Sequence, residues 1–442
     1  MNKKKIIYII FENANRELVG KLLLGTYALI KNYHVVIGEK NELRSIIKYL
    51  PPGIIIEKAL RKGSNKRFND WKKLGHEIYS LDEEALMYHD NKIYLNQNID
   101  YNINLFINIF FLWSEKHKKM IKNNKVKKKS KIVGNPRIDI LKEPFRQIYD
   151  FKAKKLIEKH GDFIFISSRF GSVNRNNPFN KLQDSKSMIT TKSYFNESTK
   201  LLNYFYDLPF ELRKKFPKTK IIIRTHPSES DKEWKKIAKK VTNCEVIFQG
   251  SAIPWILAAK KVIHNRDTIG LESWILKKKT ICFDPFHGSG LHDKLFKKVC
   301  YICKSYSDVN KLIIKNKKEK NIKYSELDHW YTNSRSKDLS FEKIINSFDN
   351  LDIKKHNLKF SNLIFLNLIN ILKKFLMFFK LINKKNRYFK FYSDKKVGDF
   401  TRLEINDNIK KFSKIINKKK INFKMHSIGK RVIFINEESL TN

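Results

Sequence analysis

Short apolar runs alternate with amphipathic segments along the first part of the chain. The runs Lys5–Phe11, His34–Gly38 and Ile54–Glu57 are rich in isoleucine and valine, and apolar residues at helical spacing follow the first two. Unbroken apolar runs of this length are typical of strands buried on both faces, and strands that alternate with helices are typical of a parallel sheet. The pattern therefore predicts a Rossmann-like domain over residues 1–150. The Gly-x-Gly-x-x-Gly fingerprint is absent, so an NAD-binding function is not favoured.

The same alternation returns after a predicted linker at Phe145–Lys154. Apolar runs at Asp162–Ser168, Lys220–Arg224 and Thr280–Phe283 are separated by segments with helical spacing. These runs again read as buried parallel strands. We therefore expect a second Rossmann-like domain over residues 151–350.

Residues 351–442 carry a different pattern. Leu363–Ile382 (LIFLNLINILKKFLMFFKLI) is dense in bulky apolar residues but is interrupted by asparagines and lysines, which fall on one stripe of a helix. Central lysines cost about 2.5–3.5 kcal/mol each in a membrane span, so a transmembrane helix is not expected. The segment predicts an amphipathic helix lying on an anionic inner-membrane surface, and a helix packed on the domain surface is the alternative.

Composition limits the classes of function. The chain has 442 residues, a hydrophobic fraction of 41% and 32 phenylalanines, which is enough for two cores and an extension. The net charge of +47 suggests nucleic acid at first, but the lysines are scattered and no nucleic-acid module is present, so we expect no nucleic-acid partner. Four cysteines do not form a disulfide framework in a chain of this size. No secretory signal is visible, and we expect a cytoplasmic protein.

Three consecutive carboxylates follow the predicted strand that ends at Ser80. They are Asp82, Glu83 and Glu84. Carboxyl ends of strands face the ligand crevice in parallel α/β sheets, and crowded acids raise one another's pKa, which suits a general base. The alternative is an acidic helix N-terminus that only stabilises the helix dipole.

Arg224 and His226 come at the end of a predicted strand in the second domain. Pro227 holds His226 in an extended conformation, so that an arginine and a histidine at this strand end can bind a phosphate. A lone histidine is more often structural. The loop after Ser168 has the glycine, serine and asparagine content of a phosphate or sugar cradle, which is also that of any exposed loop.

The segment Lys261–Pro285 predicts a strand, a turn, a helix and another strand. Asp267 or Thr268 can cap the helix, whose N-terminal N–H groups attract anions. Glu272 lies in the first turns of this helix, where a carboxylate can accept hydrogen bonds from ribose hydroxyls. The alternative is a surface glutamate.

Four motifs occur in a fixed order: Asp82-Glu-Glu-Ala85, Lys131–Asp139 (KIVGNPRID), Arg224-Thr-His-Pro227 and His264–Ser273 (HNRDTIGLES). Together they resemble a family of bacterial surface carbohydrate biosynthesis proteins, which is similar to GT-B glycosyltransferases and, in its His-Pro motif, to capsule Kdo transferases and sialyltransferases. The resemblance covers residues 1–345. It implies a GT-B-like α/β fold in which an acceptor domain (1–150) and a nucleotide-sugar domain (151–350) face a cleft, with residues 351–442 as a basic C-terminal helical extension.

The resemblance also implies roles for residues. The histidine of the His-Pro pair contacts the donor phosphate in the related transferases, which points to His226, and the acidic motif supplies the catalytic base, which points to Glu83 or Glu84. The family pattern has glycine after the acids, whereas this chain has Ala85. Glu272 would hold the ribose. The implied donor site comprises Ser168, Arg224, His226, Thr268, Gly270, Glu272 and Ser273.

We therefore expect a metal-independent glycosyltransferase, without a cofactor, that is peripheral to the inner membrane. It would move a sugar from a nucleotide-sugar to a glycan or glycolipid acceptor, namely a cell-surface polysaccharide or lipopolysaccharide. Two other activities of the same fold are alternative functions: a UDP-sugar 2-epimerase and a CDP-polyol phosphotransferase. A non-catalytic membrane-surface protein or a nucleic-acid binder is the alternative from another class.

Overall fold

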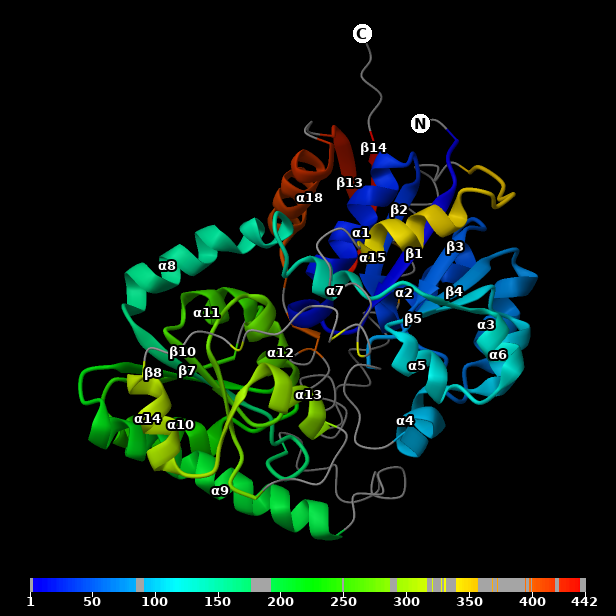
Figure 1. Ribbon diagram of the computed structural model, residues 1–442. Helices are drawn as coiled ribbons and strands as arrows, with labels where there is room; N and C mark the ends of the chain where they lie inside the picture. Colours follow the sequence, from blue (N-terminus) through cyan, green and yellow to red (C-terminus); the bar gives the residue numbers. More distant parts are fainter. Residues whose placement is uncertain are drawn as a thin grey trace.

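The computed structural model contains two α/β domains, each built on its own sheet (Figure 1). It describes residues 3–84, 91–175, 192–248, 250–286, 292–315, 339–356, 400–417 and 421–437, together with Lys320, Leu327, Trp330, Leu368, Leu372, Asp394, Val397 and Gly398. The predicted architecture of two Rossmann-like parallel sheets is confirmed.

The first sheet has eight strands in the order β13-β14-β2-β1-β3-β4-β5-β6. Its six N-terminal strands are all parallel: β1 (Ile6–Phe11), β2 (His34–Glu39), β3 (Ile54–Glu57), β4 (Glu77–Leu81), β5 (Ile109–Leu112) and β6 (Ser130–Ile132). Every residue of β1 and β2 is buried, which explains their unbroken apolar runs. The helices of this part are α1 (Val19–Ile30), α2 (Lys40–Ile46), α3 (Asn65–Lys73), α4 (Asn91–Asn98), α5 (Glu115–Met120), α6 (Asn124–Lys128) and α7 (Pro136–Asp139).

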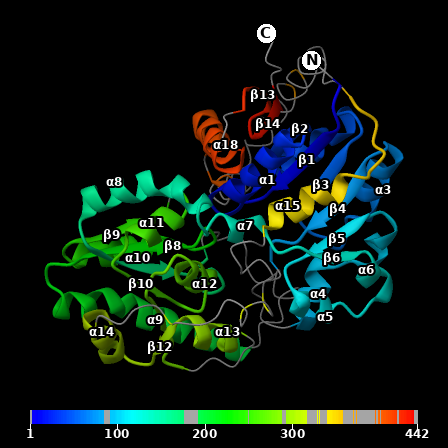
Figure 2. The same cartoon turned by 45° about the horizontal axis from the view of Figure 1, so that its top comes forward.

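The C-terminal part of the chain completes this first sheet. β13 (Phe423–Gly429) and β14 (Val432–Glu437) form a hairpin, and β14 pairs antiparallel with β2. Helix α18 (Arg402–Asn417) packs against α1, so that red and blue segments lie side by side in Figures 1 and 2. The expectation of a purely helical extension is therefore wrong over residues 421–437. The reason is hydrophobic: Val432–Ile435 is a buried apolar run that covers the otherwise open edge of β2.

The second sheet has six parallel strands in the order β12-β11-β10-β7-β8-β9. The strands are β7 (Phe163–Ser168), β8 (Lys220–Thr225), β9 (Cys244–Ile247), β10 (Lys261–His264), β11 (Thr280–Phe283) and β12 (Tyr301–Cys303). The helices are α8 (Asp150–His160), α9 (Lys192–Lys215), α10 (Lys232–Lys240), α11 (Ile253–Ala258), α12 (Thr268–Ile275), α13 (His292–Val299) and α14 (Tyr306–Ile314).

The chain crosses back to the first domain after α14. Helix α15 (Ser340–Ile345) packs on α1, as the yellow helix over the blue domain in Figure 2 shows. The buried carboxylate of Asp139 accepts hydrogen bonds from the Ser340 backbone N–H (2.8 Å) and hydroxyl (2.6 Å). Residues 340–348 thus pack on the first domain, although we had expected them in the second.

The predicted amphipathic helix at Leu363–Ile382 lies outside the described residues, apart from Leu368 and Leu372. Within the described ranges, no helix is both long enough and apolar enough to cross a membrane.

Candidate functional site

A network of buried charges lies at the carboxyl ends of β1 and β3. Lys58 follows β3 and contacts both Glu12, which follows β1, and Glu17 (3.5 Å). Glu17 also accepts a hydrogen bond from the Glu12 backbone N–H (2.7 Å) and pairs with Arg16 (2.8 Å). Burial alone would raise the pKa of Glu17, but the charges of Lys58 and Arg16 lower it well below its usual range. The network therefore fixes Arg16 at the end of β1.

The two candidate bases of the acidic motif have different surroundings. Glu83 is buried and forms an ion pair with Lys21 on α1 (2.6 Å), and both side chains are almost inaccessible to solvent. Glu84 pairs with Arg16 (2.8 Å), and each of these side chains is about one-third exposed, at 35% and 34%. Of the two glutamates, Glu84 is thus the one that a substrate can reach.

Asp82 holds the backbone of this motif. Its carboxylate accepts hydrogen bonds from the Glu84 backbone N–H (2.7 Å) and the Tyr94 hydroxyl (2.9 Å), and its carbonyl accepts one from the indole of Trp113 (2.7 Å). Burial would raise the pKa of Glu84, but the charges of Arg16 and Lys58 lower it to about 2. Glu84 is therefore an ionised carboxylate at neutral pH.

In the second domain, Glu229 organises the loops that follow β7 and β8. Its buried carboxylate accepts hydrogen bonds from the Ser168 hydroxyl (2.6 Å), the Trp234 indole (2.9 Å) and the His226 backbone N–H (3.4 Å). Ser168 is thus held by Glu229. Gly171 allows the two loops to approach, because a Cβ there would lie 2.0 Å from the Ser228 hydroxyl.

His226 directly follows β8, as the sequence predicts, and its side chain is half-buried. The Ser228 backbone N–H donates to its Nδ1 (3.2 Å), so the neutral ring carries its proton on Nε2. Burial and the neighbouring charge of Arg169 lower the pKa of His226 to about 3. A neutral imidazole with a donating Nε2–H is therefore available at neutral pH.

Asp267, not Thr268, caps α12. Its side chain accepts hydrogen bonds from the Ile269 backbone N–H (3.1 Å) and the Ser167 hydroxyl (2.8 Å). Burial would raise the pKa of Asp267, but hydrogen bonding with His264 and Ser167 lowers it. Thr268 is half-buried at the first position of the helix.

Gly270 and Ser273 lie on the inner side of the same helix. A Cβ on Gly270 would lie 2.5 Å from the His264 ring and 2.9 Å from the Cys300 sulfur, so packing accounts for this glycine. Ser273 is fully buried.

Glu272 faces the first domain. Its carboxylate pairs with Arg137 of α7 (3.3 Å), and both side chains are largely buried. Burial raises the pKa of Glu272, although Arg137 opposes the shift. Burial lowers the pKa of Arg224 to about 10, although the negative charge of Glu272 opposes this shift. Arg224 also donates to the Gly250 carbonyl.

These groups form one interdomain site, which we define as Arg16, Glu84 and Arg137 of the first domain with Arg224, His226 and Glu272 of the second. The pKa of His226 responds to the charges of Arg16 and Glu84, and that of Glu272 to Arg16 and Arg137, so the groups lie close enough for their charges to interact. The arrangement combines anion-binding cations, a neutral imidazole and an ionised carboxylate.

Sequence reasoning missed two arginines of this site. Arg16 lies in the helical turn Ala14–Leu18 that follows β1, so a search of the segments after strand ends could have found it. Arg137 lies within the motif Lys131–Asp139, and the motif by itself indicates no role for it. Glu229 lies three residues after His226, and no sequence pattern indicates that its buried carboxylate accepts several hydrogen bonds.

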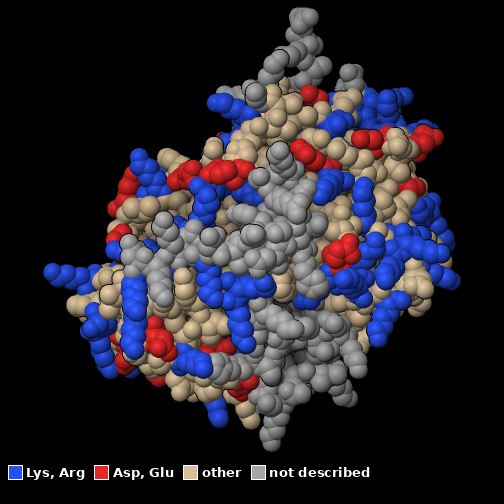
Figure 3. All heavy atoms as spheres, in the orientation of Figure 1, with Lys and Arg blue, Asp and Glu red and all other residues tan. Residues whose placement is uncertain are grey.

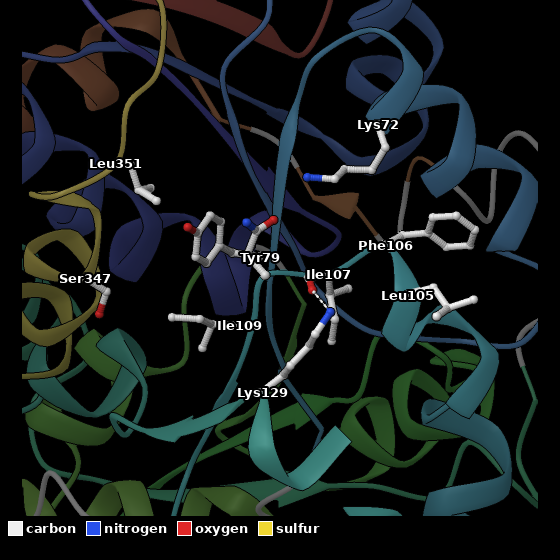
Figure 4. Close-up of a pocket in the computed structure, with 10 residues that line it drawn as sticks. Lys72, Tyr79, Leu105, Phe106, Ile107, Ile109, Lys129, Ser347 and Leu351 are labelled. Carbon is white, nitrogen blue, oxygen red and sulfur yellow. Dashed lines mark hydrogen bonds between the residues drawn. The ribbon is translucent and has the colours of Figure 1, made fainter. Parts of the chain in front are cut away.

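A pocket of about 450 Å³ lies elsewhere, at the amino ends of β4 and β5 (Figure 4). It is lined by Tyr79, Leu105 and Phe106 together with Lys72 and Lys129. In the part of the chain that the structure describes, no group of three His, Cys, Asp or Glu side chains could hold a metal ion.

No protein-family profile matches the chain, and no curated protein sequence does. Solved structures of similar fold include the UDP-GlcNAc 2-epimerase from Methanocaldococcus jannaschii, which is 11% identical with a TM-score of 0.50 over 78% of this chain and 99% of that chain. Its complex with UDP-GlcNAc and UDP is 14% identical, with a TM-score of 0.52 over the same shares of the two chains. At these identities the similarity establishes the fold, and the chain has the two-domain GT-B architecture.

Proposed function

We propose that the chain is an enzyme that acts on a nucleotide-sugar at the interdomain site, and that it is a glycosyltransferase. The observation that carries this proposal is that both domains contribute charged groups to one site: Arg137 pairs with Glu272 across the domains (3.3 Å), and the charges of Arg16 and Glu84 act on the pKa of His226. Positive and neutral donors suit a donor diphosphate, and a carboxylate suits an acceptor hydroxyl. The order of the four sequence motifs supports a role in surface carbohydrate biosynthesis.

In the proposed mechanism, the Nε2–H of His226 and the guanidinium of Arg224 stabilise the leaving phosphate. Glu84 takes the proton of the acceptor hydroxyl as that oxygen attacks the anomeric carbon and the bond to the nucleotide breaks. A carboxylate with a pKa of about 2 is a weak base while Arg16 holds it. A diphosphate that draws Arg16 away would raise the pKa of Glu84 and so increase its basicity.

Glu272 is proposed to hold the donor ribose. It must first exchange its ion pair with Arg137 for the ribose hydroxyls. The acceptor is proposed to be a cell-surface polysaccharide or lipopolysaccharide. Residues 363–382, outside the described part, would keep the enzyme at the inner membrane.

A UDP-sugar 2-epimerase is the second candidate. The names of the two structures described above favour it, since both belong to a UDP-GlcNAc 2-epimerase, one with UDP-GlcNAc and UDP bound. The two activities differ in their need for an acceptor. An epimerase converts UDP-GlcNAc to its 2-epimer without any acceptor, and NMR of the sugar detects this product. A transferase releases nucleotide only when a glycan acceptor is added.

The first test is a thermal-shift screen with UDP-, CMP- and CDP-linked sugars and with CDP-glycerol, followed by turnover of the donor that stabilises the protein. We expect His226→Ala and Glu84→Gln each to lower kcat by roughly 10²-fold or more, because each removes a group that acts in the transition state. Glu233→Gln, on exposed α10, is the control. Unchanged turnover in both site variants would refute the proposal. A screen that responds only to CDP-glycerol would favour the polyol phosphotransferase.

A further inference from the structure

We propose that the first domain carries a docking surface for an anionic lipid bilayer, separate from the interdomain site. The surface, called the basic face below, consists of the exposed lysines of α5, α6 and their connection, with Leu105 beside them. The lysines are Lys119, Lys122, Lys125, Lys127 and Lys128.

The basic face has an uncompensated positive charge. Between Lys116 and Lys131 the sequence contains nine lysines and no Asp or Glu. The five lysines of the face form no ion pair with any carboxylate in the described ranges. Figure 3 shows Lys and Arg side chains gathered over α3, α5 and α6.

Some exposed lysines elsewhere are paired with nearby acids. On α10, Lys235 pairs with Asp231 (2.8 Å) and Lys236 with Glu233 (2.6 Å). At the end of α9, Lys214 pairs with Glu211 (2.7 Å). These paired lysines each follow an acid by about one helical turn, whereas α5, α6 and their connection contain a single acid, the exposed Glu115 at the start of α5.

An exposed apolar side chain accompanies this charge. Leu105, at the end of the 3₁₀ helix Tyr101–Leu105, is 77% exposed, the largest value for a bulky apolar residue in the described part. This 3₁₀ helix packs against α6. Leu105 and its neighbour Phe106 also line the pocket of Figure 4, whose rim includes Lys129. Lysines around an apolar side chain provide the two signals that interfacial membrane binding needs.

The chemistry favours a bilayer over a nucleic acid. Single-stranded nucleic acids are bound by aromatic side chains that stack on bases between the cations. The exposed apolar residue here is aliphatic, and it can enter the headgroup region of a bilayer but cannot stack. The surface lies apart from the interdomain site, because Leu105 precedes β5 and α6 precedes β6, at the amino ends of the strands, whereas the site lies at their carboxyl ends.

The test measures co-sedimentation of the full chain with vesicles of phosphatidylglycerol and phosphatidylcholine, compared with phosphatidylcholine alone. Each lysine near an anionic surface contributes roughly fivefold in affinity, so Lys125→Gln/Lys127→Gln/Lys128→Gln should weaken binding at least about tenfold. The matched control is Lys232→Gln/Lys239→Gln/Lys240→Gln, which removes the same charge from exposed α10 and should change affinity less than about twofold. Leu105→Ser should weaken the binding that persists at high salt.

Three results would overturn the proposal. They are equal weakening by both triple variants, no binding of the unmodified protein to the anionic vesicles, and a triple variant that loses single-stranded RNA binding while vesicle binding is unchanged. None of these readouts depends on catalytic activity, so the docking surface can fail while the proposed sugar transfer stands, and the reverse.

Discussion

Glu83 and Glu84 are neighbours in the chain, yet the fold gives them opposite environments. Glu83 points into the domain and pairs with Lys21, while Glu84 is partly exposed beside Arg16. A buried ion pair whose partner is removed leaves an uncompensated charge, which costs about 3–5 kcal/mol, whereas exposed pairs contribute about 1 kcal/mol or less. The first glutamate therefore contributes to stability and the second is available for chemistry.

This contrast gives a prediction for stability. Glu83→Gln should lower the free energy of unfolding by about 3 kcal/mol, because Lys21 stays buried without its counter-charge. Glu84→Gln should change it by less than about 1 kcal/mol. Urea unfolding followed by circular dichroism measures both. The double variant Lys21→Met/Glu83→Leu should recover most of the lost free energy of unfolding. A Glu83→Gln protein as stable as the parent would contradict the prediction that this buried ion pair is needed for stability.

At the scale of elements, the hairpin β13–β14 belongs to the first domain although the sequence places it last. Phe434 is fully buried, pairs in register with Val36 of β2 and stacks edge-on against His34 (5.5 Å). Arg402 of α18 donates to the Met425 carbonyl of β13, which joins the helix to the hairpin. Strand and helix thus close one edge of the sheet together.

Truncation of Phe434 tests this role. Phe434→Ala should destabilise the protein by about 3–5 kcal/mol, because it removes a large side chain from a packed core. Ser427→Ala, on the exposed face of β13, should change stability by less than about 0.5 kcal/mol. Thermal unfolding of both proteins provides the comparison. Similar melting temperatures for the two variants would show that the hairpin adds little to the domain.

The sequence predicts the features that local patterns determine, but not the contacts between residues that lie far apart along the chain. Strands such as β1 are predictable because burial on both faces demands an unbroken apolar run. Strand ends indicated the acidic motif Asp82–Glu84 and His226 as candidates, because the carboxyl ends of parallel strands lie at the ligand crevice. The pairing of β14 with β2 and the ion pair between Arg137 and Glu272, which lie 135 residues apart, depend on tertiary packing that no local pattern encodes.

For the whole molecule, buried neutral histidines make the free energy of unfolding depend on pH. His117 and His76 are almost fully buried, and burial lowers the pKa of His117 to about 3 and that of His76 to about 4. An unfolded histidine has a pKa of about 6.5, so below that pH the unfolded chain binds more protons than the folded one. The free energy of unfolding must therefore fall as the pH falls from about 6.5 towards 4.

We expect each of these histidines to remove on the order of 2 kcal/mol of stability at about pH 5 relative to neutral pH. The measurement is urea unfolding at both pH values. His117→Gln, which keeps a hydrogen-bonding group near Tyr94, should show a smaller loss on acidification than the parent protein. An unfolding free energy that stays constant between the two pH values would contradict the burial of neutral histidines.

The position of β14 also has a consequence for synthesis on the ribosome. The second domain is translated before residues 421–437, and all its strands lie between residues 163 and 303. The first domain begins earlier but keeps an uncovered edge at β2 until the hairpin emerges. An open strand edge can pair with other chains, so the nascent protein is exposed to misassembly until residues 421–437 have been translated. The domain that begins first is therefore the one that finishes last.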